Sequence, residues 1–227
     1  MTILAVDTAL GACSAALLDN ERVLAHELVV MERGHAEALA PMVQLVMQHA
    51  NLRFEQLDRL AVTTGPGTFT GQRVGLAFMR GLRLALKRPL IGITTLEAMA
   101  AAAMAEAQAA FGAALHDAKR DEVYAGFHSR NETLLEPVLL PMDDAVVRIR
   151  MLIGMTPETV AFAGTAAEAA CERLSENGGR GIVTSIRHPD ALWVARLALH
   201  SQDDTGEAPR PLYLRPPDAR LPVRSTA

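Results

Sequence analysis

The segment Gly65-Pro-Gly-Thr-Phe-Thr-Gly-Gln-Arg73 joins a predicted strand at 58–64 to a helix that begins near Thr70. Glycine reaches backbone conformations that are closed to residues with a Cβ atom, so such a segment can reverse the chain tightly. Thr68 or Thr70 could cap the helix by accepting hydrogen bonds from its first N–H groups. The residues expected to shape the turn are Gly65, Pro66, Gly67 and Gly71.

The N-terminus of this helix is electropositive and could hold a phosphate or a carboxylate. A strand-to-helix turn that binds nothing accounts for the same residues. A Walker A loop is excluded, because that loop has Lys and then Ser or Thr after its last glycine. Here Gln72 and Arg73 follow Gly71.

The helix from Gly71 to about Lys87 has a wider apolar arc than an ordinary surface helix. Gly75 and Gly81 each cost about 1 kcal/mol of helix stability relative to Ala, so other contacts should compensate. Two explanations stay open: a partner subunit on a second buried side, or a helix deep in the core. The basic residues, which fall within about 80° of one another, are Arg73, Arg80, Arg83 and Lys87. This basic stripe is by default a solvated face, but it could meet a partner's acidic groups or a tRNA phosphate.

Composition favours one large or two small soluble domains. The chain has 227 residues, half of them hydrophobic, and a net charge of −4, so it is a poor autonomous binder of nucleic acid. Its two cysteines, Cys13 and Cys171, lie far apart in the sequence, which suits a reducing compartment. The N-terminus does not resemble a signal peptide and no apolar run could span a membrane. We therefore expect a cytoplasmic protein with no membrane contact.

The first half of the chain predicts a strand meander followed by alternating helices and strands. Strands are expected at 2–7, 12–18, 22–30, 58–64 and 90–93, and helices at 35–50, 71–87 and from Thr94 or Thr95 to about 109. Pro41 lies inside the first helix and should kink or strain it. The helices at 35–50 and 71–87 flank the fourth strand.

The second half repeats this order. Strands are expected at 113–117, 122–128, 134–140, 159–163 and 182–185, helices at 143–150, 164–176 and 190–201, and a terminal strand at 209–215. Prolines at both ends of 134–140 favour an edge strand. We predict an α/β fold with two similar halves, 1–110 and 111–227, and a loose tail from about 216. Such duplication is typical of the actin, Hsp70 and sugar kinase class, in which a nucleotide sits between the halves.

Four motifs together resemble the TsaB (YeaZ) family. They are Ile3 to Asp7 with Thr8, the glycine segment 65–71 with Arg73, Asp117-Ala-Lys-Arg-Asp-Glu-Val-Tyr124, and Pro211-Leu-Tyr-Leu-Arg215. The resemblance implies a degenerate actin-like ATPase (ASKHA) fold. It also implies a role in bacterial synthesis of threonylcarbamoyladenosine (t6A), next to the anticodon of tRNAs that read ANN codons.

In that family the chain acts as a non-catalytic scaffold for a larger, TsaD-like transferase paralogue, and a small TsaE-like ATPase completes the assembly. The resemblance implies that tRNA is met only through this complex, and that ATP and a metal belong to the paralogue. It places the partner surface on the helices 35–50 and 71–87. The residues expected there are His35, Leu39, Met42, Val43, Val46, Arg73, Leu76, Ala77, Arg80 and Gly81. Without the paralogue, a homodimer through the same helices would cover them.

The sequence departs from the catalytic members of this class. The paralogue binds its metal through two histidines four residues apart, but Leu39 stands four residues after His35. Asp7-Thr8-Ala9 lacks the glycine of the Asp-x-Gly phosphate hairpin. Degenerate candidates for nucleotide contact are Asp7, Thr8, Gly164 and Thr165. The remaining histidines have no companion at ligand spacing and are expected to be surface or capping residues: His26, His49, His116, His128, His188 and His200.

Two enzymatic alternatives remain. One is a small-molecule kinase or ATPase of the same fold, and the other is a peptidase that acts on its own paralogue. The signatures of serine hydrolases, zincins and Cys-x-x-Cys redox proteins are absent from the sequence. The acidic residues Asp117, Asp121 and Glu122 surround a turn, where they could be solvated caps or could face the interdomain cleft.

Overall fold

The computed structural model describes residues 1–154, 158–201 and 207–215, so the predicted tail from 216 lies outside it. The first sheet contains β1 (Thr2–Asp7), β2 (Ala12–Asp19), β3 (Arg22–Val30), β4 (Arg59–Thr63) and β5 (Leu90–Ile93), in the order β3-β2-β1-β4-β5. β1, β2 and β3 form an antiparallel meander, and β4 and β5 continue the sheet in parallel with β1. The order of the predicted strands is therefore confirmed in this half.

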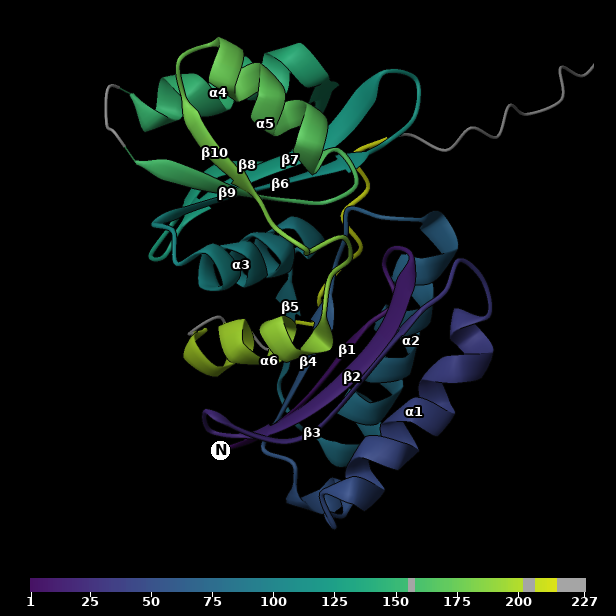
Figure 1. The fold of residues 1–227 in the computed structure, drawn as a ribbon. Coiled ribbons are helices and arrows are strands. Elements are labelled where there is room, and N and C mark those ends of the chain that lie inside the picture. The colour runs from purple at the N-terminus through teal and green to yellow at the C-terminus, as the bar shows by residue number, and fades with distance from the viewer. Residues whose placement is uncertain (155–157, 202–206, 216–227) are drawn as a thin grey trace, which may run out of the picture.

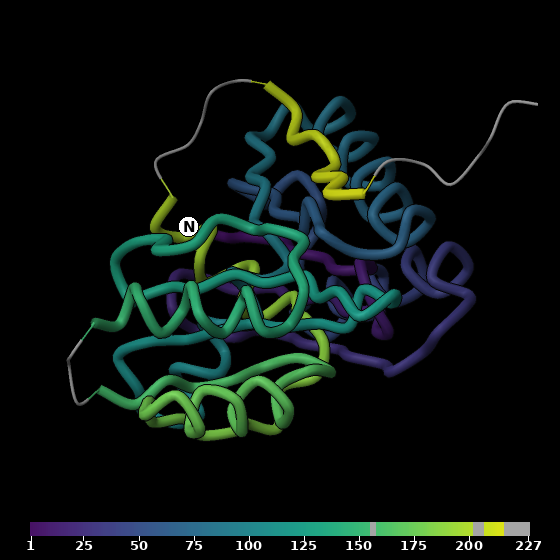
Figure 2. The backbone as a smooth tube through the Cα atoms, turned by 90° about the horizontal axis from the view of Figure 1, so that it is seen from above, coloured from purple at the N-terminus to yellow at the C-terminus, as the bar shows by residue number. Residues whose placement is uncertain are grey.

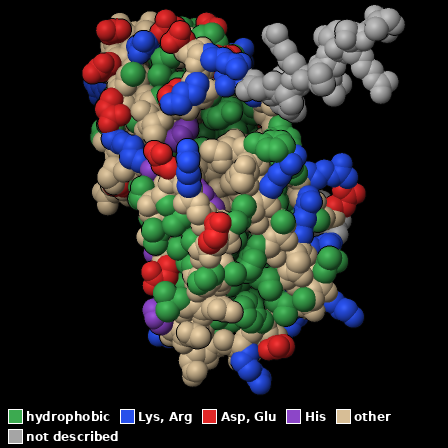
Figure 3. Space-filling view, turned by 90° about the vertical axis from the view of Figure 1, so that its right-hand side faces the viewer, with side chains coloured by type: hydrophobic (Ala, Val, Ile, Leu, Met, Phe, Trp, Pro, Cys, Tyr) green, Lys and Arg blue, Asp and Glu red, His purple; other side chains and the backbone are tan. Residues whose placement is uncertain are grey.

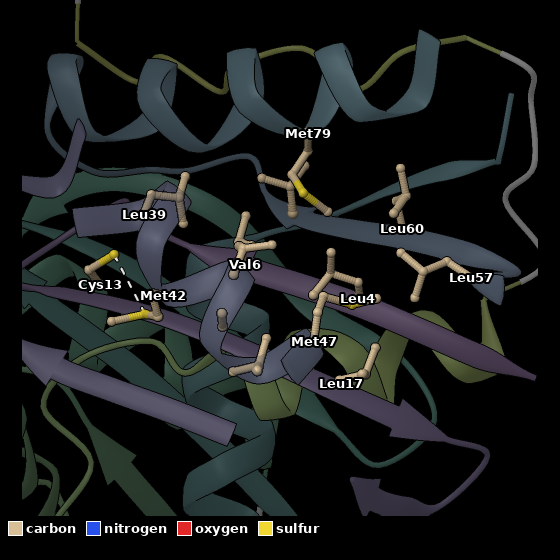
Figure 4. Close-up of a cluster of buried hydrophobic side chains, with 14 of the residues drawn as sticks. Leu4, Val6, Cys13, Leu17, Leu39, Met42, Met47, Leu57, Leu60 and Met79 are labelled. Atoms are coloured by element: carbon tan, nitrogen blue, oxygen red, sulfur yellow. Dashed lines mark hydrogen bonds between the residues drawn. The ribbon is translucent and has the colours of Figure 1, made fainter. Parts of the chain in front are cut away.

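Side chains of β1 alternate between two cores because successive residues of a strand point to opposite faces. Leu4 and Val6 pack against α1 (His35–His49) and α2 (Phe69–Leu86), in the cluster drawn in Figure 4. Ile3 and Ala5 pack on the other face against α6 (Ala191–His200). A sheet covered on both faces in this way holds the end of β1, and hence Asp7, inside the protein.

The second sheet repeats the first. β6 (Phe111–Asp117), β7 (Glu122–Ser129) and β8 (Thr133–Pro141) form its meander, and β9 (Thr159–Ala163) and β10 (Arg180–Val183) add parallel strands beside β6. The order is β10-β9-β6-β7-β8, so β8 is an edge strand, as its prolines predict. α4 (Met142–Ile153) and α5 (Ala167–Glu176) cover its outer face. The predicted α/β class with two similar halves is confirmed.

The two sheets are joined by helices that exchange between them. α3 (Thr95–Ala107) follows the first sheet in sequence but packs on β6, β7 and β9, whereas α6 follows the second sheet but packs on the first. α3 and α6 also contact each other, so the molecule forms a stack of helix, sheet, helix, sheet and helix layers (Figure 1). The junction between the halves is therefore a packed core rich in small residues, including Ala98, Ala100 and Ala195.

Most predicted boundaries agree with the structure to within a few residues. Thr68, not Thr70, caps α2, because its Oγ1 accepts a hydrogen bond from the Gly71 N–H at 3.1 Å. The strand predicted at 182–185 begins two residues earlier, at Arg180. A short 3-10 helix, η1 (Phe54–Gln56), precedes β4.

The strand predicted at 209–215 is wrong. The structure assigns no strand there, and the segment makes one backbone hydrogen bond to the first sheet, from Leu212 N to Thr64 O at 2.8 Å. Pro209 and Pro211 have no N–H to donate, so the segment cannot complete a ladder. It lies across the surface instead. We call residues 209–215 the C-terminal strap.

Candidate functional site

The glycines of the 65–73 segment let two loops approach each other closely. A Cβ atom on Gly67 would lie 2.3 Å from the carbonyl oxygen of Ala9, and one on Gly71 would lie 2.2 Å from that of Thr8. The Thr8 hydroxyl joins the same contact, because it donates to Gly71 O at 2.7 Å and accepts from Gly75 N at 3.0 Å. The 65–73 segment therefore packs the start of α2 closely against the turn after β1.

Asp7 is fully buried at the end of β1. Its Oδ1 accepts hydrogen bonds from the Thr63 hydroxyl at 2.5 Å and from Ala9 N at 3.2 Å. Its Oδ2 is buried and has no partner among the described residues. Burial raises the pKa of Asp7 to about 7, although both hydrogen bonds act in the opposite direction. The carboxyl group is thus a buried structural acid, screened from the cleft.

A hollow of about 450 Å³ opens between the two halves, beside the start of α2 and the β6–β7 turn. Its charged lining consists of Glu32, Asp117 and Lys119, so carboxylates outnumber cations there. Asp117 accepts from Lys119 N at 2.8 Å and from its Nζ at 2.9 Å, and Lys119 is therefore already paired. Asp117 both caps its turn and lines the cleft.

Gly164 and Thr165, the candidates at the second phosphate-loop position, also make their close contacts within the protein. Gly164 has a φ of 102°, and a Cβ atom there would lie 2.0 Å from the carbonyl oxygen of Leu115. The Thr165 hydroxyl accepts from Asp117 N at 3.0 Å. The four degenerate candidates Asp7, Thr8, Gly164 and Thr165 are thus engaged with the protein itself. Together with the acidic lining, this arrangement does not fit the polyphosphate of a nucleotide.

Two histidines differ from the sequence expectation. His35 is buried, and its Nε2 lies 3.0 Å from Leu10 O, so it cannot reach a partner. His128 is also buried rather than a surface residue, and burial lowers its pKa to about 4. Among the described residues, no three His, Cys, Asp or Glu side chains are grouped so that they could hold a metal ion.

The α1 residues expected at a partner surface are buried in the protein and do not face solvent. His35, Leu39, Met42, Val43 and Val46 are all buried against the first sheet and α2. Most of the large apolar side chains of α1 lie on its inner side, because there they bury the most area against the sheet. The residues that α1 exposes are Ala36, Glu37, Ala40, Pro41, Gln44, Leu45, Gln48 and His49.

On α2 only part of the expected set is accessible. Leu76 is buried, Arg80 is half-buried, and Arg73, Ala77 and Gly81 are exposed. Gly75 points inward, because a Cβ atom there would lie 2.8 Å from Thr8 Oγ1, while one on Gly81 would meet nothing within 4 Å. We define the α1/α2 outer face by its exposed small or apolar residues: Ala36, Ala40, Leu45, Phe69, Ala77, Gly81, Leu84 and Ala85. In Figure 3, hydrophobic side chains spread over the lower half of the side that carries these helices.

The contacts of the C-terminal strap with α2 and the β6–β7 turn were not predicted from the sequence. The strap runs beside α2 (Figure 2), where Tyr213 stacks on Phe69 and its hydroxyl accepts a hydrogen bond from Arg73 Nε at 2.9 Å. Arg80 donates to the carbonyl oxygen of Pro209. At its far end, Arg215 donates to Ala118 O at 2.7 Å and to Glu122 at 2.5 Å. The strap therefore links α2 to the β6–β7 turn.

Comparison with known proteins gives consistent matches. A family model described as "TsaD: tRNA N6-adenosine threonylcarbamoyltransferase" matches residues 28–188. The Haemophilus influenzae tRNA threonylcarbamoyladenosine biosynthesis protein TsaB is 32% identical over 95% of this chain and 94% of that protein. The Escherichia coli protein of the same name is 39% identical, over 58% of this chain and 57% of that protein.

Solved structures agree. YeaZ from Pseudomonas aeruginosa superposes with a TM-score of 0.78 at 31% identity, covering 94% of this chain and 99% of that chain. The ROK hexokinase of Thermus thermophilus, at 15% identity and a TM-score of 0.51, shares the fold alone. The predicted actin-like and sugar kinase class is thereby confirmed. No helix within the described ranges is long and apolar enough to cross a membrane.

Proposed function

This chain belongs to the TsaB (YeaZ) family, and from that premise we propose that it is a non-catalytic scaffold subunit in the synthesis of threonylcarbamoyladenosine in tRNA. Its partner is the larger, TsaD-like transferase paralogue, which carries the active site, the ATP and the metal. A TsaE-like ATPase completes the assembly, and tRNA is bound through the complex.

The observation that carries this proposal is the α1/α2 outer face. The inner sides of both helices already fill the core of the first sheet, yet Leu84 and Phe69 remain 73% and 50% exposed. Ala77, Gly81 and Ala85 follow one another at four-residue steps along α2, so a second helix could approach its backbone closely. An exposed apolar surface of this kind is typical of a protein interface.

The internal contacts of the phosphate-loop positions support a scaffold role over catalysis. Both phosphate-loop positions use their polar groups internally, and carboxylates line the space between the halves. A kinase or ATPase of this fold needs backbone N–H groups and a glycine that face the phosphates. This chain offers neither at the turns described above, so the chemistry belongs to the paralogue.

The test is size-exclusion chromatography with light scattering, on this chain alone and mixed with the larger paralogue from the same organism. We expect a homodimer that is replaced by a heterodimer. Gly81→Leu should weaken the heterodimer at least about tenfold, because the new side chain enters open space on the outer face. Ala105→Leu, at an exposed site on α3, is the matched control and should bind normally.

A monomer that ignores the paralogue would overturn the proposal. ATP turnover by the purified single chain would then favour the kinase or ATPase alternative. Equal binding by wild type and Gly81→Leu, with a heterodimer still formed, would move the interface away from α2.

A further inference from the structure

We infer that Arg73, packed over the Phe69 ring and hydrogen-bonded to Tyr213, is the polar anchor of the α1/α2 outer face and binds a carboxylate side chain of the larger partner protein. The inference rests on the proposed function, because it specifies the chemistry by which the same surface recognises its partner. The three residues come from two segments far apart in sequence, the start of α2 and the C-terminal strap.

The geometry of this cluster fixes the guanidinium group in one place. The Arg73 Cζ atom lies 3.5 Å from the centre of the Phe69 ring and 5.9 Å from that of Tyr213. The two rings are stacked, with centroids 5.5 Å apart and an interplanar angle of 29°. Arg73 Nε donates to the Tyr213 hydroxyl at 2.9 Å. Cation–π contact and the hydrogen bond together hold a long side chain that would otherwise be free to move.

This arrangement leaves the binding end of the guanidinium available. Within the described parts of the chain, Arg73 makes no ion pair, and its two Nη groups donate to no other residue. Two parallel N–H groups of an arginine match the two oxygens of a carboxylate. Because the side chain is already ordered, binding would cost little further conformational entropy.

The surroundings favour a protein partner over RNA. Phe69 and Tyr213 are half-exposed, and the next outward residues along α2 are Ala77 and Gly81, which carry no charge. Of the other basic residues of this helix, Arg80 and Arg83 are half-buried, and Arg80 already donates to Pro209 O. Lys87 lies fourteen residues after Arg73, about 21 Å along the helix axis. RNA binding needs several cations that contact successive phosphates. A single fixed arginine among aromatic and small apolar residues is instead the composition of a protein interface centre.

The experiment measures affinity for the purified larger partner protein by titration calorimetry. Arg73→Lys should weaken binding about 10- to 100-fold, because an ammonium group cannot make the two parallel hydrogen bonds. Tyr213→Phe keeps the ring but removes the acceptor, and should weaken binding about 3- to 10-fold. Arg196→Lys is the matched control, because Arg196 stacks 4.6 Å over Trp193 on α6, away from the outer face, and should bind as wild type does. Circular dichroism should show all three variants folded.

Carbodiimide cross-linking identifies the ligand directly. In the complex, the Arg73→Lys variant places an amine at this site, and a neighbouring carboxylate of the partner should couple to it as an amide that mass spectrometry locates. If Arg73→Lys and Tyr213→Phe bind the partner as well as wild type does, the inference fails while the proposed function stands. If they lose affinity only for tRNA, an RNA phosphate replaces the carboxylate and the inference is overturned. If wild type does not bind the partner at all, the proposed function itself fails.

Discussion

Asp7 places a fully buried carboxyl group at the end of β1. The strand before it is apolar and buried, and the carboxyl group is fully buried with one oxygen unpaired among the described residues. An ionised carboxylate in such a place is costly, so the protonated form is favoured and the pKa rises to about 7. The folded protein therefore holds a proton that the unfolded chain releases near its ordinary pKa of 3.8.

Asp7 should make stability fall as pH rises. Between about pH 4 and pH 7 the folded state binds more protons than the unfolded state, so raising the pH favours unfolding, by up to about 4 kcal/mol. Asp7→Asn keeps the acceptor for Thr63 and Ala9 and should remove this slope. Denaturant unfolding across that pH range checks it. Asp144→Asn, at an exposed site on α4, is the control, and parallel profiles for wild type and Asp7→Asn would contradict the account.

The histidines show the limit of reasoning from single residues. The sequence shows that Leu39, and not a second histidine, stands four residues after His35. It does not show that the His35 ring lies beside the carbonyl oxygen of Leu10. His128 has no companion at ligand spacing, which predicts a surface or capping residue. It is buried beneath α3, which approaches from elsewhere in the chain.

At the scale of the element, Gly75 and Gly81 of α2 have opposite roles. Both reduce helix propensity by the same amount, so the sequence treats them alike. In the structure, Gly75 contacts Thr8, whose hydroxyl is held by two hydrogen bonds, whereas Gly81 faces open space. The compensating contacts that the sequence predicts for both glycines are made at Gly75, and they lie inside this chain.

Replacing each glycine with alanine should therefore change stability in opposite directions. Gly81→Ala should raise the free energy of unfolding by about 1 kcal/mol, and Tm by about 2–4 °C. Gly75→Ala should lower the free energy by about 1–3 kcal/mol, because the Thr8 hydroxyl cannot move aside without losing its partners. Differential scanning calorimetry of the pair decides this, and shifts of the same sign would show that both positions are equally open.

At the scale of the whole molecule, the halves are held together by segments that leave their own sheet. α3 and α6 exchange between the sheets, and the C-terminal strap connects α2 to the β6–β7 turn. The strap ends in Arg215, which is 19% exposed at its side chain and pairs with Glu122. A partner that binds at Phe69, Arg73 and Tyr213 would therefore contact the C-terminal strap, whose other end is bonded to the β6–β7 turn.

Cutting that link should loosen the turn. Arg215→Ala removes hydrogen bonds to Ala118 O and to Glu122, and should cost about 1–3 kcal/mol while amide hydrogen exchange rises in residues 117–123. Arg210→Ala, in the same strap, removes only an exposed ion pair with Glu207 at 3.7 Å and should change little. Equal exchange in both variants would show that the strap does not hold the turn.

The sequence by itself determined the elements, their order and the duplicated α/β class. Strand alternation, the threonine caps and the glycines at 65–71 act within a few residues, so their signals can be read locally. The strand predicted at 209–215 is wrong, because Pro209 and Pro211 have no N–H with which to pair with a neighbouring strand.

Only the tertiary structure decided which sides of α1 and α2 are free. Apolar residues surround both helices. Leu39 and Val43 lie on the inner side, whereas Ala40, Gly81 and the larger Leu84 lie on the outer side. That choice depends on the area each side buries against the sheet, which no spacing along one helix records. The Arg73 anchor has the same origin, since its aromatic neighbour Tyr213 lies 140 residues away and meets it only in the folded chain.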